Sequence, residues 1–234
     1  MDHPLTGRIL HRDESLLVMD KPSGLLVHRG WGRDRETLVD WVRDLLAMGT
    51  VYPVHRLDRG TSGVIAFALD AAAAQRLGEA TAAGALRKEY RALVRGAPPD
   101  HVTVDHPIPR RPGGPRVEAT TEIETLYTAA AHPRHLSWVA ARLRHGRLHQ
   151  VRRHLKHLSH PVIGDANYGN GPLNRAVAER YGLRRLALHA AHLWLPHPAT
   201  GELVRFSAEL PEDLRAPLLR MGFPAPKLKL EGTQ

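Results

Sequence analysis

The chain of 234 residues contains no cysteine. This absence excludes disulfide bonds, cysteine-ligated zinc sites and catalysis by a thiol. The chain also lacks any run of about 18 apolar residues, the length a helix needs to cross a bilayer. Its first residues, MDHPLTGRIL, show no basic segment followed by an apolar block and a cleavage site. The sequence therefore predicts a cytoplasmic protein that does not enter a membrane.

Motifs for several kinds of chemistry are also missing. Neither a Walker-type GK(S/T) nor a strand-borne GxGxxG occurs, so no nucleotide cofactor is expected. Ser62 lacks the G-x-S-x-G motif of a serine hydrolase. A two-carboxylate glycosidase is not favoured either, because Asp165 is the only candidate for a second carboxylate beside Asp58. Five closely spaced histidines have no cysteine or nearby acid to complete a metal shell: His145, His149, His154, His157 and His160. We therefore expect chemistry without a cofactor or a metal.

The charge balance is strongly basic, with 33 Lys and Arg against 24 Asp and Glu, a formal charge of +9. Such a balance favours a polyanionic partner, nucleic acid first and an anionic membrane surface second. The basic residues are densest from Arg142 to Asp165, a stretch with no acid before Asp165. Apolar residues recur there at helical spacing, and basic side chains occupy the other faces. This predicts an amphipathic helix whose basic face is either solvated or follows RNA phosphates.

A second dense segment runs from Tyr52 to Leu69, YPVHRLDRGTSGVIAFAL, and places a polar loop before a run of β-forming residues. Asp58 lies between Arg56 and Arg59, whose charges favour an ionised carboxylate. Gly60 and Gly63 permit a sharp turn or a close backbone approach. The same pattern is also typical of an aspartate that caps a surface turn, so the loop alone does not decide between the two interpretations.

Periodicity predicts a protein of the α+β class. Thr37 and Asp40 form a capping-box pattern before a helix that Gly49 is expected to end, and Asp70 precedes an Ala-rich helix running to Ala83. Residues 96–115 are rich in Pro and Gly and are expected to form a linker or flexible loop. Strands are expected at 8–19, 25–27, 64–69, 86–94, 117–127, 135–143, 184–196 and 203–208.

The segment HRLDRGTSG, residues 55–63, resembles the HRLD-(K/R)-x-TSG motif of the RluA-type pseudouridine synthases. Three further segments resemble that family's motifs in the same order: DKPSGLLVH, KEYRALVRG and GRLHQVRRHL. The resemblance covers about residues 8–210. SGLLVHRGW and residues 174–190 look like the TruC group, whose members form pseudouridine 65 of tRNA, at the edge of the acceptor stem.

The resemblance implies a mixed, largely antiparallel central sheet with flanking helices in a bilobed α+β catalytic domain, which we expect over residues 1–223. No S4-like module is expected before it, and residues 224–234 are expected to be a flexible tail. The implied activity is isomerisation of a uridine in structured RNA, tRNA first and ribosomal RNA second, by a monomer that needs no protein partner. A catalytically silent RNA-binding protein is the alternative.

The resemblance also implies roles for individual residues. Asp58 matches the catalytic carboxylate, as nucleophile or as base, and Arg147 matches the arginine that pairs with it. Tyr90 matches the tyrosine that stacks on the uracil and acts as the acid–base residue at C5. The residues expected to bind the substrate are His55, Arg56, Val151, Arg152, Arg153 and Lys156.

Overall fold

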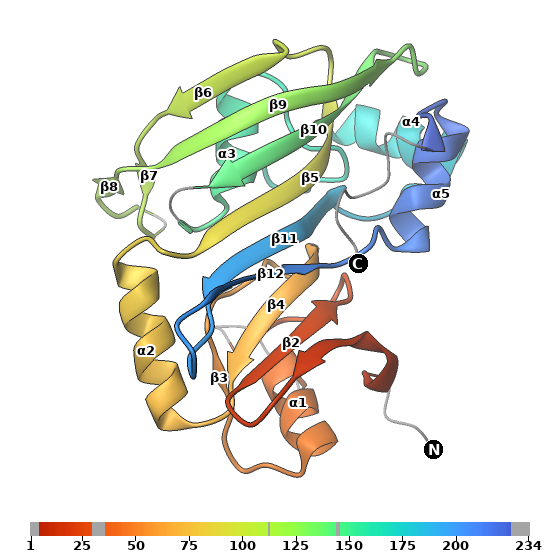
Figure 1. Ribbon diagram of the computed structural model, residues 1–234. Coiled ribbons are helices and arrows are strands. Elements are labelled where there is room, and N and C mark those ends of the chain that lie inside the picture. Colours follow the sequence, from red (N-terminus) through yellow and green to blue (C-terminus); the bar gives the residue numbers. More distant parts are fainter. Residues whose placement is uncertain (1–4, 30–35, 112, 144–145, 226–234) are drawn as a thin grey trace. The chain divides into compact units, whose positions relative to one another are not determined.

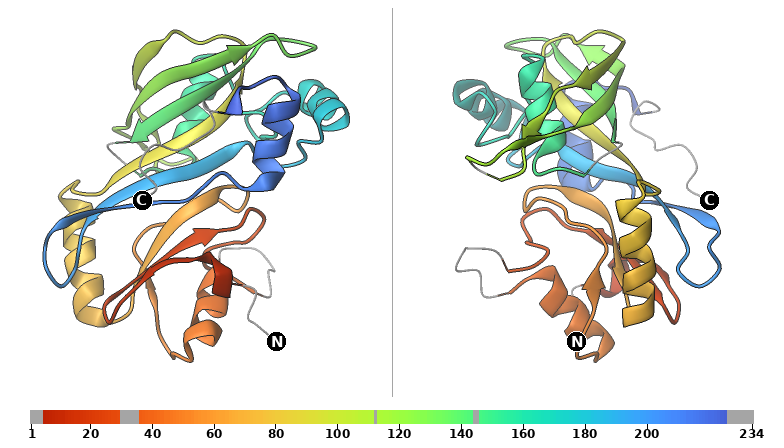
Figure 2. Two further views of the ribbon diagram at one scale, coloured as in Figure 1. Left: turned by 45° about the vertical axis from the view of Figure 1, so that its right-hand side comes forward. Right: turned by 90° about the vertical axis from the view of Figure 1, so that its left-hand side faces the viewer.

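The computed structural model describes residues 5–29, 36–111, 113–143 and 146–225. The chain divides into two compact units. Unit 1 comprises Met1–Arg87 and Ala190–Ala208, and unit 2 comprises Lys88–His189 and Glu209–Gln234. Figures 1 and 2 show both units, and each is described by itself below.

Unit 1 is built on strands that are paired largely antiparallel. Its strands are β1 (Ile9–Arg12), β2 (Leu16–Lys21), β3 (Tyr52–Pro53), β4 (Ser62–Ala68), β11 (Leu188–Pro196) and β12 (Leu203–Ser207), after a short 3-10 turn at Thr6–Arg8. The order is β1-β2-β4-β11, with β3 beside β4 and β12 beside β11. Helix α2 (Ala71–Ala82) packs against β4, and apolar residues from both elements share one core with β2 and β11.

Unit 2 contains four strands that pair antiparallel in the order β5-β10-β9-β6. These strands are β5 (Arg87–Arg95), β6 (His101–Asp105), β9 (Thr120–Ala129) and β10 (Leu136–Leu143). Helix α3 (Gln150–His157) lies against β9, on the side of the sheet that faces away from the viewer in Figure 1. The remaining elements are a small hairpin of β7 (Ile108–Pro109) and β8 (Arg116–Val117) and the helices α4 (Gly171–Tyr181) and α5 (Glu212–Arg220).

The first helix, α1 (Leu38–Leu46), starts as its sequence predicts. The Thr37 hydroxyl accepts from the Asp40 backbone N–H, and the Asp40 carboxylate accepts from the Thr37 N–H, so the capping box is complete. The helix ends at Ala47, which adopts a left-handed conformation (φ 52°), before it reaches Gly49. Similarly, the Asp70 side chain caps α2 by accepting from the Ala73 N–H.

Three expectations about secondary structure were wrong. Residues 25–27 form no strand; the carbonyls of Leu26 and Val27 instead accept from the first N–H groups of α1. Residues 96–115 are not a linker, because β6 pairs with β9 and β7 pairs with β8. The strand expected at 184–196 begins only at Leu188. The α+β class and the largely antiparallel sheet are confirmed.

Among the residues described, no helix is both long enough and apolar enough to span a membrane. The tail expected at 224–234 lies almost wholly outside the described residues, which end at 225.

Candidate active site

Asp58 lies on the loop between β3 and β4 of unit 1. Leu57 is buried and anchors the loop, Asp58 and His55 are half-buried, and Arg56 and Arg59 are exposed. The Thr61 N–H donates to the Asp58 carbonyl at 3.0 Å, which closes a turn around the carboxylate. The loop therefore holds Asp58 at a defined place while keeping it within reach of a ligand.

The segment Lys21–Gly24 is hydrogen-bonded to this loop and holds it in place. Lys21 is fully buried, and its ammonium group donates to the carbonyls of Pro22, Leu25 and Arg59 at 2.8, 2.7 and 3.3 Å. The Gly24 N–H donates to the same Arg59 carbonyl at 2.8 Å, and the Ser23 hydroxyl donates to the Gly60 carbonyl at 2.8 Å. A buried ammonium is tolerated only where its donors are satisfied, so Lys21 serves to lock two loops together.

Gly63 begins the exit from the loop at a position where a side chain cannot fit. Its φ is +112°, and a Cβ there would lie 2.1 Å from the carbonyl oxygen of Ala190 on β11. Only glycine allows this backbone approach between β4 and its neighbour. The loop and the strand pairing therefore depend on one another.

We expect Lys21→Met to lower the free energy of unfolding by roughly 1–3 kcal/mol, because three carbonyls lose a charged donor that is itself fully buried. We also expect kcat to fall while KM changes little, since the loop that carries Asp58 loses its brace. Urea unfolding and steady-state kinetics measure the two effects. Ser23→Ala, which removes one bond of the same brace, should give a smaller change; an unfolding free energy equal to wild type in Lys21→Met would refute the bracing role.

Tyr90 lies in β5 of unit 2, opposite Ala141 of β10, and is 8% exposed. Its neighbours Glu89 and Arg91 point to the other face of the strand, as alternation requires. Glu89 accepts from Arg91 and, at 2.7 Å, from Arg142, which also bonds Glu124 of β9 at 2.8 Å. Burial raises the pKa of Glu89, but the two guanidinium groups outweigh it and hold that pKa below its ordinary value. This network fixes the register of the strands around Tyr90.

Lys88 lies two residues before Tyr90 and therefore on the same face of β5. Burial lowers the pKa of Lys88 to about 8. Its ammonium nitrogen would lie 3.1 Å from a Cβ placed on Gly146, the residue before Arg147. Motif matching alone did not assign a role to Lys88, although it belongs to the KxY motif.

Arg147 lies in the loop that leads into α3. Its side chain is exposed, and Nε donates to the Glu118 carbonyl at 3.2 Å, a bond that does not use the two Nη groups. The Arg147 N–H donates to the side chain of Gln150 at 3.1 Å, and Gln150 in turn donates to the carbonyl of Thr120 at 2.9 Å. The position of Arg147 is thus tied to the start of β9.

Helix α3 presents its predicted residues in two different surroundings. Val151 and Arg152 are buried, Arg153 is half-buried, and Lys156 is exposed. The guanidinium of Arg152 donates to both oxygens of Asp165, from Nε at 2.7 Å and from Nη2 at 2.9 Å. Burial raises the pKa of Asp165, but its bonds to Arg152 and to backbone N–H groups hold that pKa below its usual value. A phosphate contact by Arg152 does not fit this geometry, because its fork is already filled by a buried carboxylate.

Tyr168 contacts several basic side chains at the start of α3. Its hydroxyl accepts from Arg153 Nε at 2.9 Å and lies 3.0 Å from His149 Nδ1, and the guanidinium groups of Arg152 and Arg153 lie over its ring. The sequence analysis assigned no role to Tyr168, and it named Asp165 only in a glycosidase interpretation that it did not adopt, although both residues belong to the segment GDANYG that follows the basic helix.

Two sets of predicted residues are therefore each held together by their own unit. His55, Arg56 and Asp58 share one loop of unit 1, and Tyr90, Arg147 and α3 belong to unit 2. Of the closely spaced histidines, His154 bonds Thr121 and the His106 carbonyl, and His160 bonds the Arg95 carbonyl. His145 lies outside the described residues.

Comparison with known proteins identifies the architecture that carries these residues. Residues 15–157, which include Asp58, Tyr90, Arg147 and α3, match the RNA pseudouridylate synthase family. The chain belongs to this family, of the RluA type. The synthase is 36% identical to tRNA pseudouridine synthase C of Yersinia pestis, with 92% of this chain and 91% of the relative covered. It is 39% identical to ribosomal large subunit pseudouridine synthase D of Xanthomonas campestris, with 92% of this chain and 68% of that relative covered.

The solved structures agree with the sequence relatives. Human RNA Pseudouridylate Synthase Domain Containing 4 superimposes on the synthase with a TM-score of 0.76 and 28% identity, over 93% of this chain and 94% of that one. The predicted family and fold are confirmed, and the synthase is by family an RNA isomerase.

Proposed function

We propose that the synthase converts a uridine at the acceptor-stem edge of tRNA to pseudouridine, with Asp58 as the catalytic carboxylate. The observation that carries the proposal is the braced loop, which fixes the backbone of Asp58 through Lys21, Ser23 and Gly24 and leaves its carboxylate half-buried. The substrate class is supported by relatives named tRNA pseudouridine synthase C, which match over about nine-tenths of both chains.

The reaction breaks the N1–C1′ bond of uridine, turns the base and joins C5 to C1′. The proton on C5 is lost, and N1 gains one, so product and substrate are isomers and no cofactor is consumed. The Asp58 carboxylate can attack or stabilise the electron-poor sugar, or it can abstract a proton. In this proposal Tyr90 stacks on the uracil and moves the C5 proton, and Arg147 pairs with the carboxylate.

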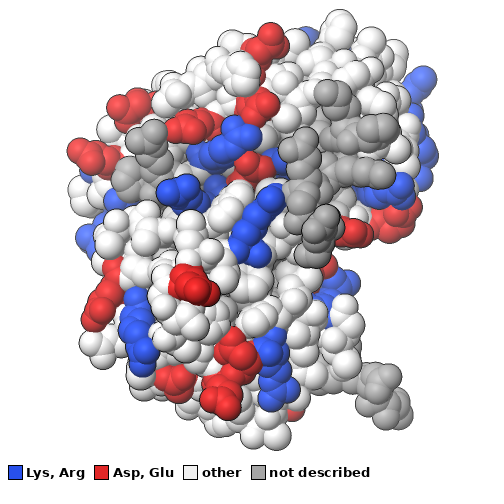
Figure 3. Space-filling model, viewed as in Figure 1, with Lys and Arg blue, Asp and Glu red and all other residues white. Residues whose placement is uncertain are grey.

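An exposed basic surface on unit 2 supports binding of structured RNA. Lys156 of α3 is exposed, and so are three arginines of the β7–β8 hairpin: Arg110, Arg111 and Arg116. The hairpin is tied to α3 because Arg153 donates to the Pro109 carbonyl at 3.4 Å. Figure 3 shows the face seen in Figure 1, where basic and acidic side chains are interspersed; α3 lies behind the sheet in that view.

We expect Arg153→Ala with Lys156→Ala to weaken tRNA binding and to flatten its salt dependence, because each lost phosphate contact removes roughly one unit of slope. Binding measured across a salt series tests this. The matched control is Arg175→Ala with Arg180→Ala, which removes the same charge from exposed positions of α4. If the affinity for tRNA depends equally on salt in the two double variants, the exposed side of α3 does not contact RNA phosphates and is a solvated face.

The function itself is tested by mapping pseudouridine in total RNA from cells with and without the gene, rescued by wild type or by Asp58→Asn. Loss of one tRNA pseudouridine that only wild type restores is the expected result. If only a pseudouridine of ribosomal RNA is lost, the substrate is ribosomal RNA, the class in the name of the Xanthomonas relative. No change in any RNA would favour a catalytically silent RNA-binding protein.

A further inference from the structure

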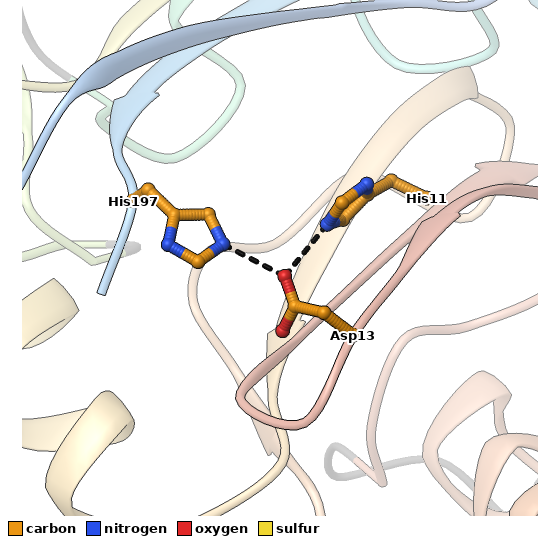
Figure 4. Close-up of side chains that lie close together, drawn as sticks. All are labelled: His11, Asp13 and His197. Carbon is orange, nitrogen blue, oxygen red and sulfur yellow. Dashed lines mark hydrogen bonds and ion pairs between the residues drawn. The ribbon is translucent and has the colours of Figure 1, made fainter. Parts of the chain in front are cut away.

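Three side chains with metal-binding atoms converge in unit 1, away from the Asp58 loop in sequence. They are His11 of β1, Asp13 of the β1–β2 turn and His197 directly after β11. His11 Nε2 lies 2.8 Å and His197 Nε2 lies 2.7 Å from the same oxygen, Asp13 Oδ2 (Figure 4). One potential ligand atom from each residue lies within 4.8 Å of the other two.

The carboxylate at the centre is held in a fixed orientation. Its second oxygen, Asp13 Oδ1, accepts from the N–H groups of Ser15 and Leu16 at 2.7 and 2.8 Å. Burial raises the pKa of Asp13, but the bonds to the two imidazoles and to the backbone hold it far below its usual value. Oδ2 is therefore an ionised oxygen whose direction is set by its own turn.

The second histidine is also fixed by its turn. The His197 N–H donates to the Glu202 carbonyl at 2.7 Å, and the Gly201 N–H donates back to the His197 carbonyl at 2.8 Å. The side chains of His11, Asp13 and His197 are 36%, 31% and 14% exposed. The cluster is thus ordered and partly exposed to solvent, which gives an ion a path to it.

We propose that His11, Asp13 and His197 bind one divalent transition-metal ion of the zinc class. Two imidazole nitrogens and one carboxylate oxygen suit zinc, nickel, copper or iron, whereas magnesium and calcium prefer sites made of oxygen. Three protein ligands leave a fourth tetrahedral position for water.

The arrangement needs only a small adjustment to accept such an ion. Bonds of about 2.0–2.2 Å to a tetrahedral zinc place ligand atoms roughly 3.3–3.5 Å apart. The two Nε2 atoms therefore move away from Oδ2 by roughly 0.6 Å each to admit the ion. The imidazoles of His11 on β1 and His197 in its turn are both partly exposed, and they can make this change by rotating about their side-chain bonds.

Ion binding also changes where each ring carries its proton. Without an ion, each Nε2–H donates to Oδ2; with an ion, each Nε2 donates its lone pair to the metal and the ring proton resides on Nδ1. At His197 this costs the bond from the Ala199 N–H to Nδ1, which is long at 3.3 Å. A neutral ring keeps one proton throughout, so binding by neutral histidines releases none.

The bound ion joins two turns that are far apart in the chain. Asp13 and His197 are 184 residues apart, and the ion connects the β1–β2 turn to the start of the β11–β12 turn. It serves as a clip within unit 1, and the inference does not depend on the proposed function, because neither turn carries a residue assigned to the reaction.

The test uses the untagged full chain, stripped with a chelator and titrated with Zn²⁺ and separately with Co²⁺. We expect one ion per chain, the intense visible absorption of tetrahedral Co²⁺, and a rise in Tm on adding Zn²⁺. His11→Phe retains a ring against Phe206, leaves the Asp13 turn intact and is expected to weaken binding at least tenfold. Asp13→Asn should do the same. His101→Gln, at an exposed position of β6, is the matched control and should bind as wild type does.

The proposal is overturned if stripped wild type shows no tetrahedral Co²⁺ spectrum. It is also overturned if His11→Phe, folded as judged by circular dichroism, binds with the same affinity and stoichiometry as wild type. In both cases the three residues form a hydrogen-bonded clamp without an ion.

Discussion

Asp58→Asn is expected to lower pseudouridine formation about a thousandfold or more, equivalent to roughly 4 kcal/mol of barrier, while the fold and tRNA binding persist. The amide has nearly the shape of the carboxylate, but it is neither a competent nucleophile nor a base. Both routes open to Asp58 therefore fail together.

The fold should persist because the bonds that brace the loop end on backbone carbonyls, which the substitution leaves in place. The turn is closed by the Asp58 carbonyl, and the brace from Lys21, Ser23 and Gly24 ends on the carbonyls of Arg59 and Gly60. Removing an anion from a site near phosphates also relieves repulsion, so binding should be equal to wild type or tighter.

Release of tritium from tRNA labelled at C5 of uridine measures the reaction, and filter binding measures affinity. Asp44→Asn, which removes an equal charge from an exposed position of α1, is the matched control and should keep full activity. Turnover within tenfold of wild type in Asp58→Asn would remove Asp58 from the catalytic role.

The elements that the sequence predicted correctly are those fixed by neighbours in the chain. Thr37 and Asp40 are three residues apart, and both halves of their capping box are present. Asp70 caps α2 over the same distance. Such local bonds form whatever the rest of the fold does, so a short window of sequence is enough to predict them.

The contact that requires glycine at position 63 could not be predicted from neighbouring residues. The sequence indicated a tight turn or a close approach, but the group it approaches is the backbone of Ala190, more than a hundred residues later in the chain. The motif residue was therefore identifiable from the sequence, whereas the physical reason for it depends on sheet topology.

The strand β6 was missed because its surroundings resemble a loop. It lies in a Pro- and Gly-rich stretch and carries polar residues, and only Val104 of its five residues is buried. Its backbone hydrogen bonds come from pairing with β9, which its amino-acid composition does not predict. An exposed strand at the end of a sheet needs little apolar surface, so periodicity gives a weak indication of it.

The charge run of α3 was assigned as one surface because a sequence does not show which charges are neutralised by distant partners. Arg152 and Arg153 are adjacent, yet the side chain of Arg152 is 8% exposed and is paired with Asp165, whereas Arg153 is half-buried and bonds Tyr168. Helical geometry turns adjacent residues by about 100°, which places one inside and the other at the surface.

Arg152→Met should lower the free energy of unfolding by about 3–5 kcal/mol at neutral pH, because it leaves the Asp165 carboxylate buried without its cation. Arg153→Met, the matched control one residue away, should cost about 1 kcal/mol or less. Urea unfolding of the full chain measures both.

The free energy of unfolding should also depend on pH differently in wild type and in Arg152→Met. In wild type the pKa of Asp165 is held below its usual value, so the pair contributes stability above the unfolded pKa of about 4 and loses it as the pH falls through the folded pKa. In Arg152→Met that contribution is absent, and protonation of Asp165 relieves the buried charge. The difference between variant and wild type should therefore narrow in acid.

A second variant separates loss of the ion pair from loss of packing. Asp165 Oδ1 also accepts from the N–H groups of Asn167 and Tyr168, and an asparagine oxygen can keep both bonds. Arg152→Met with Asp165→Asn should therefore recover part of the stability lost in Arg152→Met alone, because no uncompensated charge remains buried. If the double variant is no more stable than the single one at neutral pH, and the deficit is the same in acid, the arginine stabilises α3 by packing and its charge is incidental.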